Sequence, residues 1–464
     1  MNRTLRVAAA AAAVGFSASF GLGQGVAFAD RPPPVDAGQL PSGDSPAPPK
    51  KTELGTNSVC TSTRKGGDGP GVPPAQQALD LARAHEFSTG AGQLVAVIDT
   101  GVQHHSRLPN LQGGGDYVST SDGTDDCDAH GTFVAGIIGA SAAPGFSGVA
   151  PDANILAIRQ YSSQYQEEGT SRGQRPEDPP KGYGPIETLG SAIRRAADLG
   201  ASVINLSLVM CNPGDIKDGG VGAALQYAAV EKDVVVVTAA GNKEETCQAG
   251  NPGLDPLHPD TDGWNTVTTN VTPARYDQYA LSVGSIDANG QPSKFSVPGP
   301  WLGVAAPGEG IVSLNPRDPN GTADGTVKEG KEDTLQGTSF ASPYVAGLAA
   351  LVRSRYPELS AAQVIRRIEA TAHAPAEGWN PYVGYGAIDP IAALTSEVPE
   401  TIHDKKPTPP LSKQLAVPAP PPPPDNLARN VALIGTASIL TLLILGYLAS
   451  FPIRRKFGLS DDDM

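Results

Sequence analysis

Basic side chains and cysteines are scarce in this 464-residue sequence, and each shortage excludes a class of protein. The 34 lysines and arginines are outnumbered by 48 aspartates and glutamates, and the resulting net charge of −14 disfavours nucleic-acid binding. Four cysteines in so long a chain exclude a small disulfide-rich scaffold, although an even number fits two bridges in an oxidising compartment. A wholly disordered chain is excluded as well, because 39% of the residues are hydrophobic.

The first 29 residues have the pattern of a secretory signal peptide. Arg3 and Arg6 precede an alanine-rich run, and residues 27–29 form an A-x-A cleavage motif. An uncleaved membrane helix is the alternative, but serine and glycine interrupt the apolar run. We therefore expect the mature chain to start near Asp30 with an N-terminal extension over residues 30–72.

A second apolar segment, residues 431–451, predicts a transmembrane helix. It contains no charged side chain and is long enough to cross a hydrocarbon core of about 30 Å. A buried core helix is the alternative, but such a helix is rarely this long and uncharged. The basic cluster at 454–456 predicts a cytoplasmic tail over residues 452–464. We expect a single-pass type I protein of the cell membrane, with everything before the helix on the extracytoplasmic (periplasmic) side.

Residues 396–430, ahead of this helix, are rich in proline and have little apolar surface to bury. Such a composition predicts an extended polyproline-like linker that holds the preceding domain off the membrane. A ligand for an SH3-type domain is the alternative, and it is disfavoured outside the cytoplasm.

Between residues 73 and 395, short β-branched runs alternate with helical stretches rich in small residues. The apolar runs have the length of strands that are buried on both faces, as in a parallel sheet: 94–98, 155–158, 203–208 and 234–237. Helices are predicted between them, at 132–138, 186–199, 222–232 and 342–355. The alternation predicts βαβ units and hence one α/β domain with a doubly wound parallel sheet.

Three residues of this domain are candidates for catalysis. Asp99 ends the first apolar strand, which places its carboxylate at the edge of the sheet where sites form. His130 and Ser339 each stand in a glycine-containing segment that opens a helix. Taken singly, these residues fit a turn, a structural histidine and a helix cap. Together they follow the order Asp, His, Ser, which is that of the subtilisin-type triad.

Each of these residue types suits one step of acyl transfer from a peptide. Ser339 would attack the carbonyl carbon, and His130 would take its proton and return it to the leaving amine. Asp99 would hold the imidazole tautomer and stabilise the imidazolium. Asn242, which follows the strand at 234–237, can offer its amide to the oxyanion together with the Ser339 backbone N–H, a contribution of ~3 to 4 kcal/mol.

These motifs resemble those of the subtilases, over the segments 95–101, 130–136, 239–242 and 337–343. The resemblance implies a subtilisin-like core of seven parallel strands. It also implies that Ser207, Leu208 and Val209 bind substrate, with Val209 standing where subtilases often have glycine. The order of signal peptide, extension, proline-rich linker and C-terminal helix is similar to that of the mycosins, the membrane-anchored subtilases of mycobacterial type VII secretion.

The same resemblance suggests which cysteines pair. Four cysteines allow three pairings. The resemblance to the mycosins favours Cys60 paired with Cys127 and Cys211 paired with Cys247. The first bond would tie the extension across the catalytic domain and make it a permanent part of the protein.

No cofactor and no metal ion are expected. The segment 139–147 after the His130 helix lacks the asparagine-rich calcium loop that many subtilases have there. Carboxylates that could bind a hard cation stand at Asp122, Asp125, Asp126 and Asp128. An acidic surface turn is nevertheless the better interpretation. His104 and His105 are expected at the surface, because no carboxylate or cysteine spacing supports a metal set.

Three polar insertions rich in proline and glycine are predicted as surface loops near the catalytic rim, at 161–185, 243–269 and 315–333. They would restrict the cleft or contact partners, so we expect narrow specificity and slow turnover on generic peptides. The leading hypothesis is a serine endopeptidase that cleaves exported proteins outside the cytoplasmic membrane. The alternative is a docking component of the type VII secretion membrane complex, with which the mycosins are associated.

Overall fold

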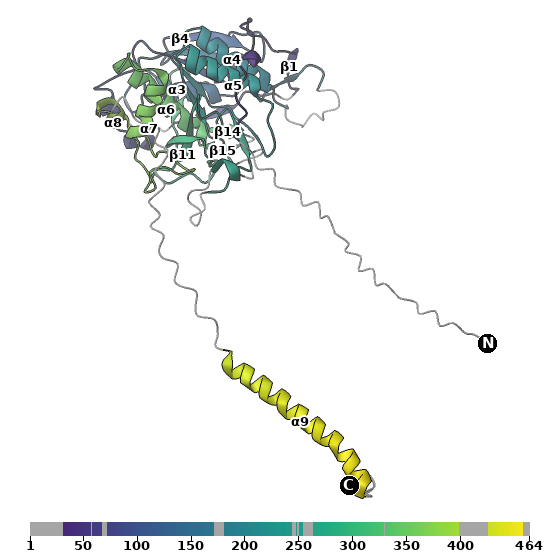
Figure 1. Cartoon of the computed structure of the whole chain (residues 1–464). Coiled ribbons are helices and arrows are strands. Elements are labelled where there is room, and N and C mark those ends of the chain that lie inside the picture. Colours follow the sequence, from purple (N-terminus) through teal and green to yellow (C-terminus); the bar gives the residue numbers. More distant parts are fainter. Residues whose placement is uncertain are drawn as a thin grey trace, which may run out of the picture. The chain divides into compact units, whose positions relative to one another are not determined.

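The computed structural model describes residues 31–398, except 57, 67–71, 171–180, 244–246, 248–249, 254–262 and 329, and then residues 426–457. The chain divides at residue 410 into two compact units (Figure 1). The predicted signal peptide lies outside the described residues, as do most of the proline-rich linker and the last residues of the tail.

The larger unit is built on a seven-stranded sheet whose strands all run parallel. In spatial order the strands are β12 (Leu302–Pro307), β11 (Leu281–Ile286), β9 (Val235–Ala239), β7 (Val203–Leu206), β3 (Leu94–Asp99), β5 (Asn154–Arg159) and β4 (Leu111–Asp116). The predicted doubly wound α/β fold is therefore confirmed, and so is the core of seven parallel strands.

Helices cover both faces of this sheet, which is why its strands read as continuous apolar runs (Figure 1). On one face, Val95 and Val97 of β3 pack in a core with helices α3 (His130–Gly139) and α6 (Thr338–Arg355). On the other face, Ala96 and Ile98 pack with α4 (Ile186–Asp198) and α5 (Gly219–Gln226), which continues into a short π-helical turn. Successive residues of one strand thus enter two separate cores.

Shorter elements surround the sheet. The extension contributes β1 (Thr52–Leu54), which pairs with β6 (Tyr165–Glu167), and β2 (Ser62–Lys65), which pairs with β14 (Thr322–Lys328). β14 also pairs with β13 (Ser313–Leu314) and β15 (Lys331–Thr334), and β8 (Met210–Asn212) pairs with β10 (Asn270–Thr272). The remaining helices are α1 (Pro74–Ala78), α2 (Leu81–Ala84), α7 (Ala361–Thr371) and α8 (Pro390–Thr395), with 3-10 turns at Ala37–Gln39 and Gly263–Thr266.

The prediction of a loop at 315–333 was wrong, because β14 and most of β15 lie there. The loop predicted at 161–185 likewise contains a strand, β6. β14 lies between β2, which is distant in sequence, on one side and its chain neighbours β13 and β15 on the other. β15 lacks the apolar pattern from which strands are predicted, because its residues are polar and all exposed.

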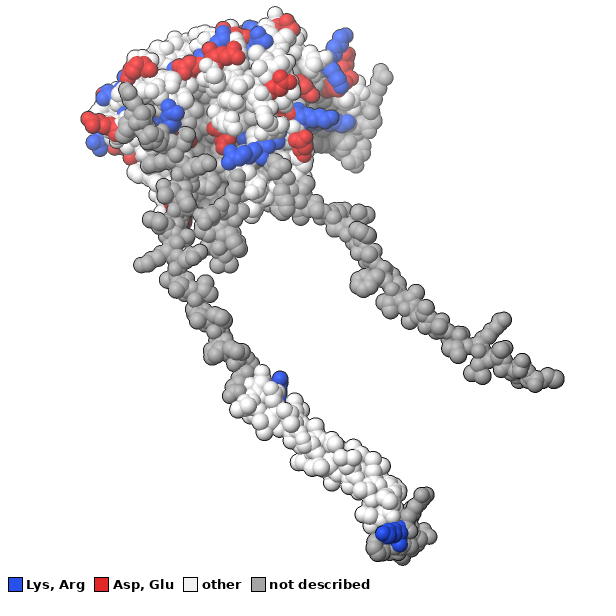
Figure 2. All heavy atoms as spheres, in the orientation of Figure 1, with Lys and Arg blue, Asp and Glu red and all other residues white. Residues whose placement is uncertain are grey.

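The smaller unit consists of one described helix, α9 (Leu427–Phe457). The span Leu427–Ile453 contains an 18-residue window with a mean hydropathy of 2.2, and it is long and apolar enough to cross a membrane. The helix is longer at both ends than the predicted 431–451. Figure 2 shows that uncharged side chains cover its middle part.

Candidate active site

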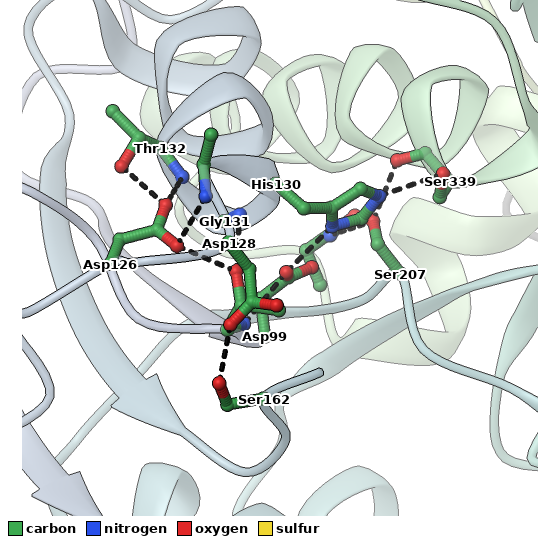
Figure 3. Close-up of polar contacts among 12 residues, drawn as sticks. Asp99, Asp126, Asp128, His130, Gly131, Thr132, Ser162, Ser207 and Ser339 are labelled. Atoms are coloured by element: carbon green, nitrogen blue, oxygen red, sulfur yellow. Dashed lines mark hydrogen bonds and ion pairs between the residues drawn. The ribbon is translucent and has the colours of Figure 1, made fainter. Parts of the chain in front are cut away.

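The three predicted catalytic side chains lie at the ends of secondary-structure elements that meet above the sheet. Asp99 is the last residue of β3, His130 is the first residue of α3, and Ser339 is the second residue of α6. His130 Nδ1 lies 2.7 Å from Asp99 Oδ1, and His130 Nε2 lies 2.9 Å from Ser339 Oγ (Figure 3). Because a carboxylate only accepts hydrogen bonds, Nδ1–H donates to Asp99 and Nε2 is left to accept the Ser339 hydroxyl proton.

The surroundings of His130 favour its protonated form. Burial lowers the pKa of the imidazole, but the charge of Asp99 and the hydrogen bond to it outweigh this effect, so the pKa is raised above 6.5. Asp99 is fully buried, and its Oδ1 also accepts the Thr100 backbone N–H at 2.7 Å. The His130 side chain is 26% exposed, and the ring of Phe340 packs beside it with centroids 5.1 Å apart. Asp99 is therefore shielded from solvent, whereas the imidazole of His130 can be reached by a substrate.

A close approach of α3 to the end of β3 explains the glycine after His130. A Cβ atom at Gly131 would lie 1.9 Å from the carbonyl oxygen of Gly101 and 3.1 Å from Asp99 Cβ. No side chain fits there, so glycine allows the imidazole to reach the buried carboxylate.

Asn242 lies beside the nucleophile and its side-chain amide is held in one orientation. Its Oδ1 accepts two hydrogen bonds of 3.0 Å, from the backbone N–H and from the hydroxyl of Thr338. A Cβ at Gly337, where φ is +150°, would lie 3.1 Å from Ser339 Oγ and 3.2 Å from Asn242 Nδ2. Gly337 therefore leaves open the space that the serine hydroxyl and the amide N–H groups share.

The segment predicted to bind substrate follows β7 directly. Ser207 is buried, whereas Leu208 and Val209 are half-buried. The Ser207 hydroxyl donates to the backbone oxygen of Ser339 at 2.7 Å and lies 3.0 Å from the hydroxyl of Ser342 (Figure 3). Its side chain thus supports the helix that carries the nucleophile.

A role for Asn205, which contacts Ser207, was not predicted from the sequence. Asn205, fully buried in β7, donates from Nδ2 to the Ser207 hydroxyl at 2.8 Å. A polar side chain in an otherwise apolar strand was the available signal, because a buried amide needs partners.

Two disulfide bonds flank the site. One joins Cys60 of the extension to Cys127, three residues before His130, with Cα atoms 4.5 Å apart. The other joins Cys211 to Cys247, with Cα atoms 5.2 Å apart.

The acidic turn before His130 is bound by the protein's own donors. Asp122 accepts the hydroxyl and the backbone N–H of Thr124, and Asp128 accepts from two serines of the 161–185 insertion. Among the described residues, no group of three or more His, Cys, Asp or Glu side chains could hold a metal ion.

His104 is exposed, but the prediction that His105 lies at the surface was wrong, because it is only 5% exposed. Its Nε2 lies 3.1 Å from the carbonyl oxygen of Gly321, and its Nδ1 accepts the Arg107 backbone N–H. These two contacts satisfy the ring inside the protein, and burial lowers the pKa of His105.

A parallel α/β sheet that brings a carboxylate, an imidazole and a serine hydroxyl into one hydrogen-bonded line defines a serine hydrolase, the class that includes the serine endopeptidases. Comparison with known proteins agrees: a profile of the Subtilase family matches residues 90–386. Mycosin-4 of Mycobacterium tuberculosis is 44% identical over 477 residues, covering 98% of both chains. The chain therefore belongs to the subtilase family and, within it, to the mycosins.

Solved structures with clear sequence identity have the same fold. The crystal structure of MycP1 from Mycobacterium smegmatis has a TM-score of 0.72 at 44% identity, covering 79% of this chain and 96% of that one. A chain in the structure of an intact ESX-5 inner membrane complex has a TM-score of 0.74 at 41% identity, covering 91% of this chain and 99% of that one.

Proposed function

We propose that this chain hydrolyses peptide bonds through an acyl-enzyme formed on Ser339. His130 removes the Ser339 proton during attack and returns it to the leaving amine, while Asp99 holds the imidazole tautomer and balances the imidazolium. The Asn242 amide and the Ser339 backbone N–H stabilise the oxyanion. Leu208 and Val209, which follow Ser207 at the carboxyl end of β7, border the bound peptide.

One observation carries this proposal: the unbroken hydrogen-bonded line from Asp99 through His130 to Ser339, with distances of 2.7 Å and 2.9 Å. A fluorophosphonate probe tests it, because such a probe reacts only with an activated serine hydroxyl. The wild-type protein should be labelled, and Ser339→Ala should not. Labelling of Ser342→Ala should persist, because that hydroxyl contacts Ser207, whereas His130 contacts Ser339. Absence of labelling in folded wild-type protein would refute the proposal.

The proposed location follows from the sequence. Residues 1–29 direct export, residues 30–72 remain as an extension of the catalytic domain (73–395), and the linker 396–430 connects it to a helix at 431–451. The basic residues after this helix favour a cytoplasmic tail over 452–464, which puts the catalytic domain on the extracytoplasmic side of the cell membrane. Protease digestion of spheroplasts should remove the catalytic domain and spare an epitope fused to the tail.

The substrates we propose are proteins exported by a type VII secretion system, and components of its membrane complex are the proposed partners. Similarity to a chain in the structure of the ESX-5 inner membrane complex supports the second part. Narrow specificity is expected on this proposal, so casein should be cleaved slowly, and efficient cleavage would contradict it.

Docking to the secretion complex is a second candidate function, which the same similarity favours. Ser339→Ala distinguishes the two roles in cells. Loss of substrate processing with secretion intact would show that proteolysis is dispensable for assembly, whereas loss of both would favour catalysis as the main role. Deletion of the whole chain is the control, and it should abolish secretion if docking matters.

A further inference from the structure

A buried carboxylate outside the catalytic line, that of Asp126, lies between the elements that carry Asp99 and His130. It is only 1% exposed, and each of its two oxygens accepts two hydrogen bonds. Figure 3 shows it beside Thr132. Its Oδ1 accepts the Thr100 hydroxyl at 2.9 Å and the Ala129 backbone N–H at 2.8 Å. Its Oδ2 accepts the backbone N–H and the hydroxyl of Thr132, at 2.8 Å and 2.6 Å.

These partners flank the catalytic pair in the sequence. Thr100 follows Asp99, whereas Ala129 and Thr132 lie on either side of His130. The Thr100 hydroxyl also accepts the Gly131 backbone N–H at 2.9 Å. One carboxylate therefore satisfies N–H groups at the start of α3, which would otherwise lack partners, and fastens that helix end to the residue after Asp99.

We propose that Asp126 is a positioning residue, whose carboxylate fixes the first turn of α3 against the end of β3 and so sets the approach of His130 to Asp99. This role rests on the proposed function of His130 and Asp99, since a misplaced base matters only if the pair performs catalysis. A displacement of about 1 Å at a reacting group can cost about 100-fold in rate.

The turn that carries Asp126 is also held from outside. Arg317 donates from Nη2 to the backbone oxygens of Asp126 and Cys127, at 2.9 Å and 2.8 Å, and from Nε to that of Thr61 in the extension. The disulfide from Cys127 to Cys60 fixes the next residue to the same segment. The extension therefore restrains the turn in which Asp126 binds the helix end.

Asp126 acts on His130 through charge as well as position. The carboxylates that raise the pKa of His130 against burial are Asp99 on β3 and Asp126 and Asp128 in the turn before α3, while α6 presents the uncharged Ser339 and Phe340 to the ring. Burial raises the pKa of Asp126 itself to about 7, although its hydrogen bonds from Thr132 and Thr100 oppose this. The group is therefore only partly ionised near pH 7, and replacing it should lower the pKa of His130 by less than loss of a full charge would.

The decisive comparison is Asp126→Asn with Asp128→Asn in the full-length protein in detergent. Both variants lose a carboxyl group near His130, but only Asp126 binds the helix end, since Asp128 binds Ser162 and Ser163. Asp126→Asn places an amide N–H₂ group opposite backbone donors, so kcat should fall about 100-fold with KM within twofold. Asp128→Asn should keep kcat within threefold. In both variants the acidic limb of kcat/KM should move to lower pH.

A second pair of variants covers the case in which Asp126→Asn does not fold. Thr132→Val removes the hydroxyl that donates to Asp126, and Thr132→Ser retains it. Thr132→Val should lower kcat about tenfold, and Thr132→Ser should restore it. Equal activity of the two Thr132 variants would overturn the proposal, as would equal loss of kcat in Asp126→Asn and Asp128→Asn, which would reduce the effect to charge.

A readout that needs no turnover separates this inference from the proposed function. Hydrogen exchange of the peptide covering residues 127–139, measured by mass spectrometry, should become faster in Asp126→Asn and Thr132→Val but not in Asp128→Asn or Thr132→Ser. Unchanged exchange in folded Asp126→Asn would refute the positioning role even in an active enzyme. A wild-type protein that resists the fluorophosphonate probe would refute the proposed function and leave this exchange test intact.

Discussion

Replacement of Asn242 by alanine tests the proposed oxyanion site. The amide is held by two hydrogen bonds of 3.0 Å from Thr338, so its Nδ2 is oriented before substrate binds. An oriented donor stabilises the negative charge that develops in the transition state more than the neutral carbonyl of the ground state. Its loss should cost about 3 to 4 kcal/mol, which lowers kcat about 100- to 1000-fold and leaves KM within about twofold.

The assay is steady-state cleavage of a fluorogenic peptide, supported by the rate of fluorophosphonate labelling of Ser339. Two variants calibrate it. Thr338→Val removes the hydroxyl that donates to Asn242 but leaves the backbone N–H in place, so kcat should fall only about tenfold, or about 1.4 kcal/mol. Asn212→Ala removes an asparagine whose amide donates to the backbone oxygen of Asp215 at 3.0 Å, and kcat should stay within twofold.

Two outcomes would refute this reasoning. If Asn242→Ala raised KM and left kcat unchanged, the amide would bind substrate and transition state equally and would not serve the oxyanion. If Asn242→Ala and Thr338→Val lowered kcat equally, the effect would arise from displacement of the turn at Gly337. A melting temperature close to that of the wild type is the condition for either conclusion.

Three further predictions concern pH, covalent links and metal ions. Because the raised pKa of His130 stabilises its protonated, inactive form, the acidic limb of kcat/KM should lie above pH 6.5, and a pH–rate profile with its limb below 6.5 would contradict this. Replacing both Cys60 and Cys127 by alanine should lower the free energy of unfolding by about 2 to 5 kcal/mol, measured by urea denaturation, because their bond closes a loop with a sequence separation of 67. Since Asp122 and Asp128 are bound by the protein's own donors, a chelator should leave the melting temperature unchanged, and a fall of several degrees would show a metal site.

The strands found from sequence are those whose side chains are apolar and β-branched. β3, β5, β7 and β9 are almost wholly buried, and their valine and isoleucine runs identify them. β4 was not predicted, because Leu111–Asp116 contains three successive glycines, which have no side chain to pack. Its pairing with β5 supplies the backbone partners that its composition does not suggest. β12, over Leu302–Pro307, is similar, since its mostly small residues are buried entirely by tertiary contacts.

Side chains with a chemical function were easier to predict than the residues that support them. Asp99, His130 and Ser339 stand in motifs whose residue types suit proton transfer, so their meeting was expected. The contacts of Asn205, Ser207 and Asp126 depend on which elements lie side by side, and sequence alone does not give that arrangement. Polar residues buried between elements acquire their roles from tertiary structure.

The glycines beside the reacting groups explain why the short sequence motifs around His130 and Ser339 are linked to the geometry of the site. Gly131 allows α3 to come within contact of the Gly101 carbonyl, and Gly337 leaves room between Ser339 Oγ and Asn242 Nδ2. A methyl group at either position would collide with backbone or occupy the reaction space, so each glycine limits how far the catalytic side chain can stand from its partner. The glycines in the short motifs around His130 and Ser339 therefore permit the close contacts of the site. This is why three residues far apart in the sequence meet within hydrogen-bonding range.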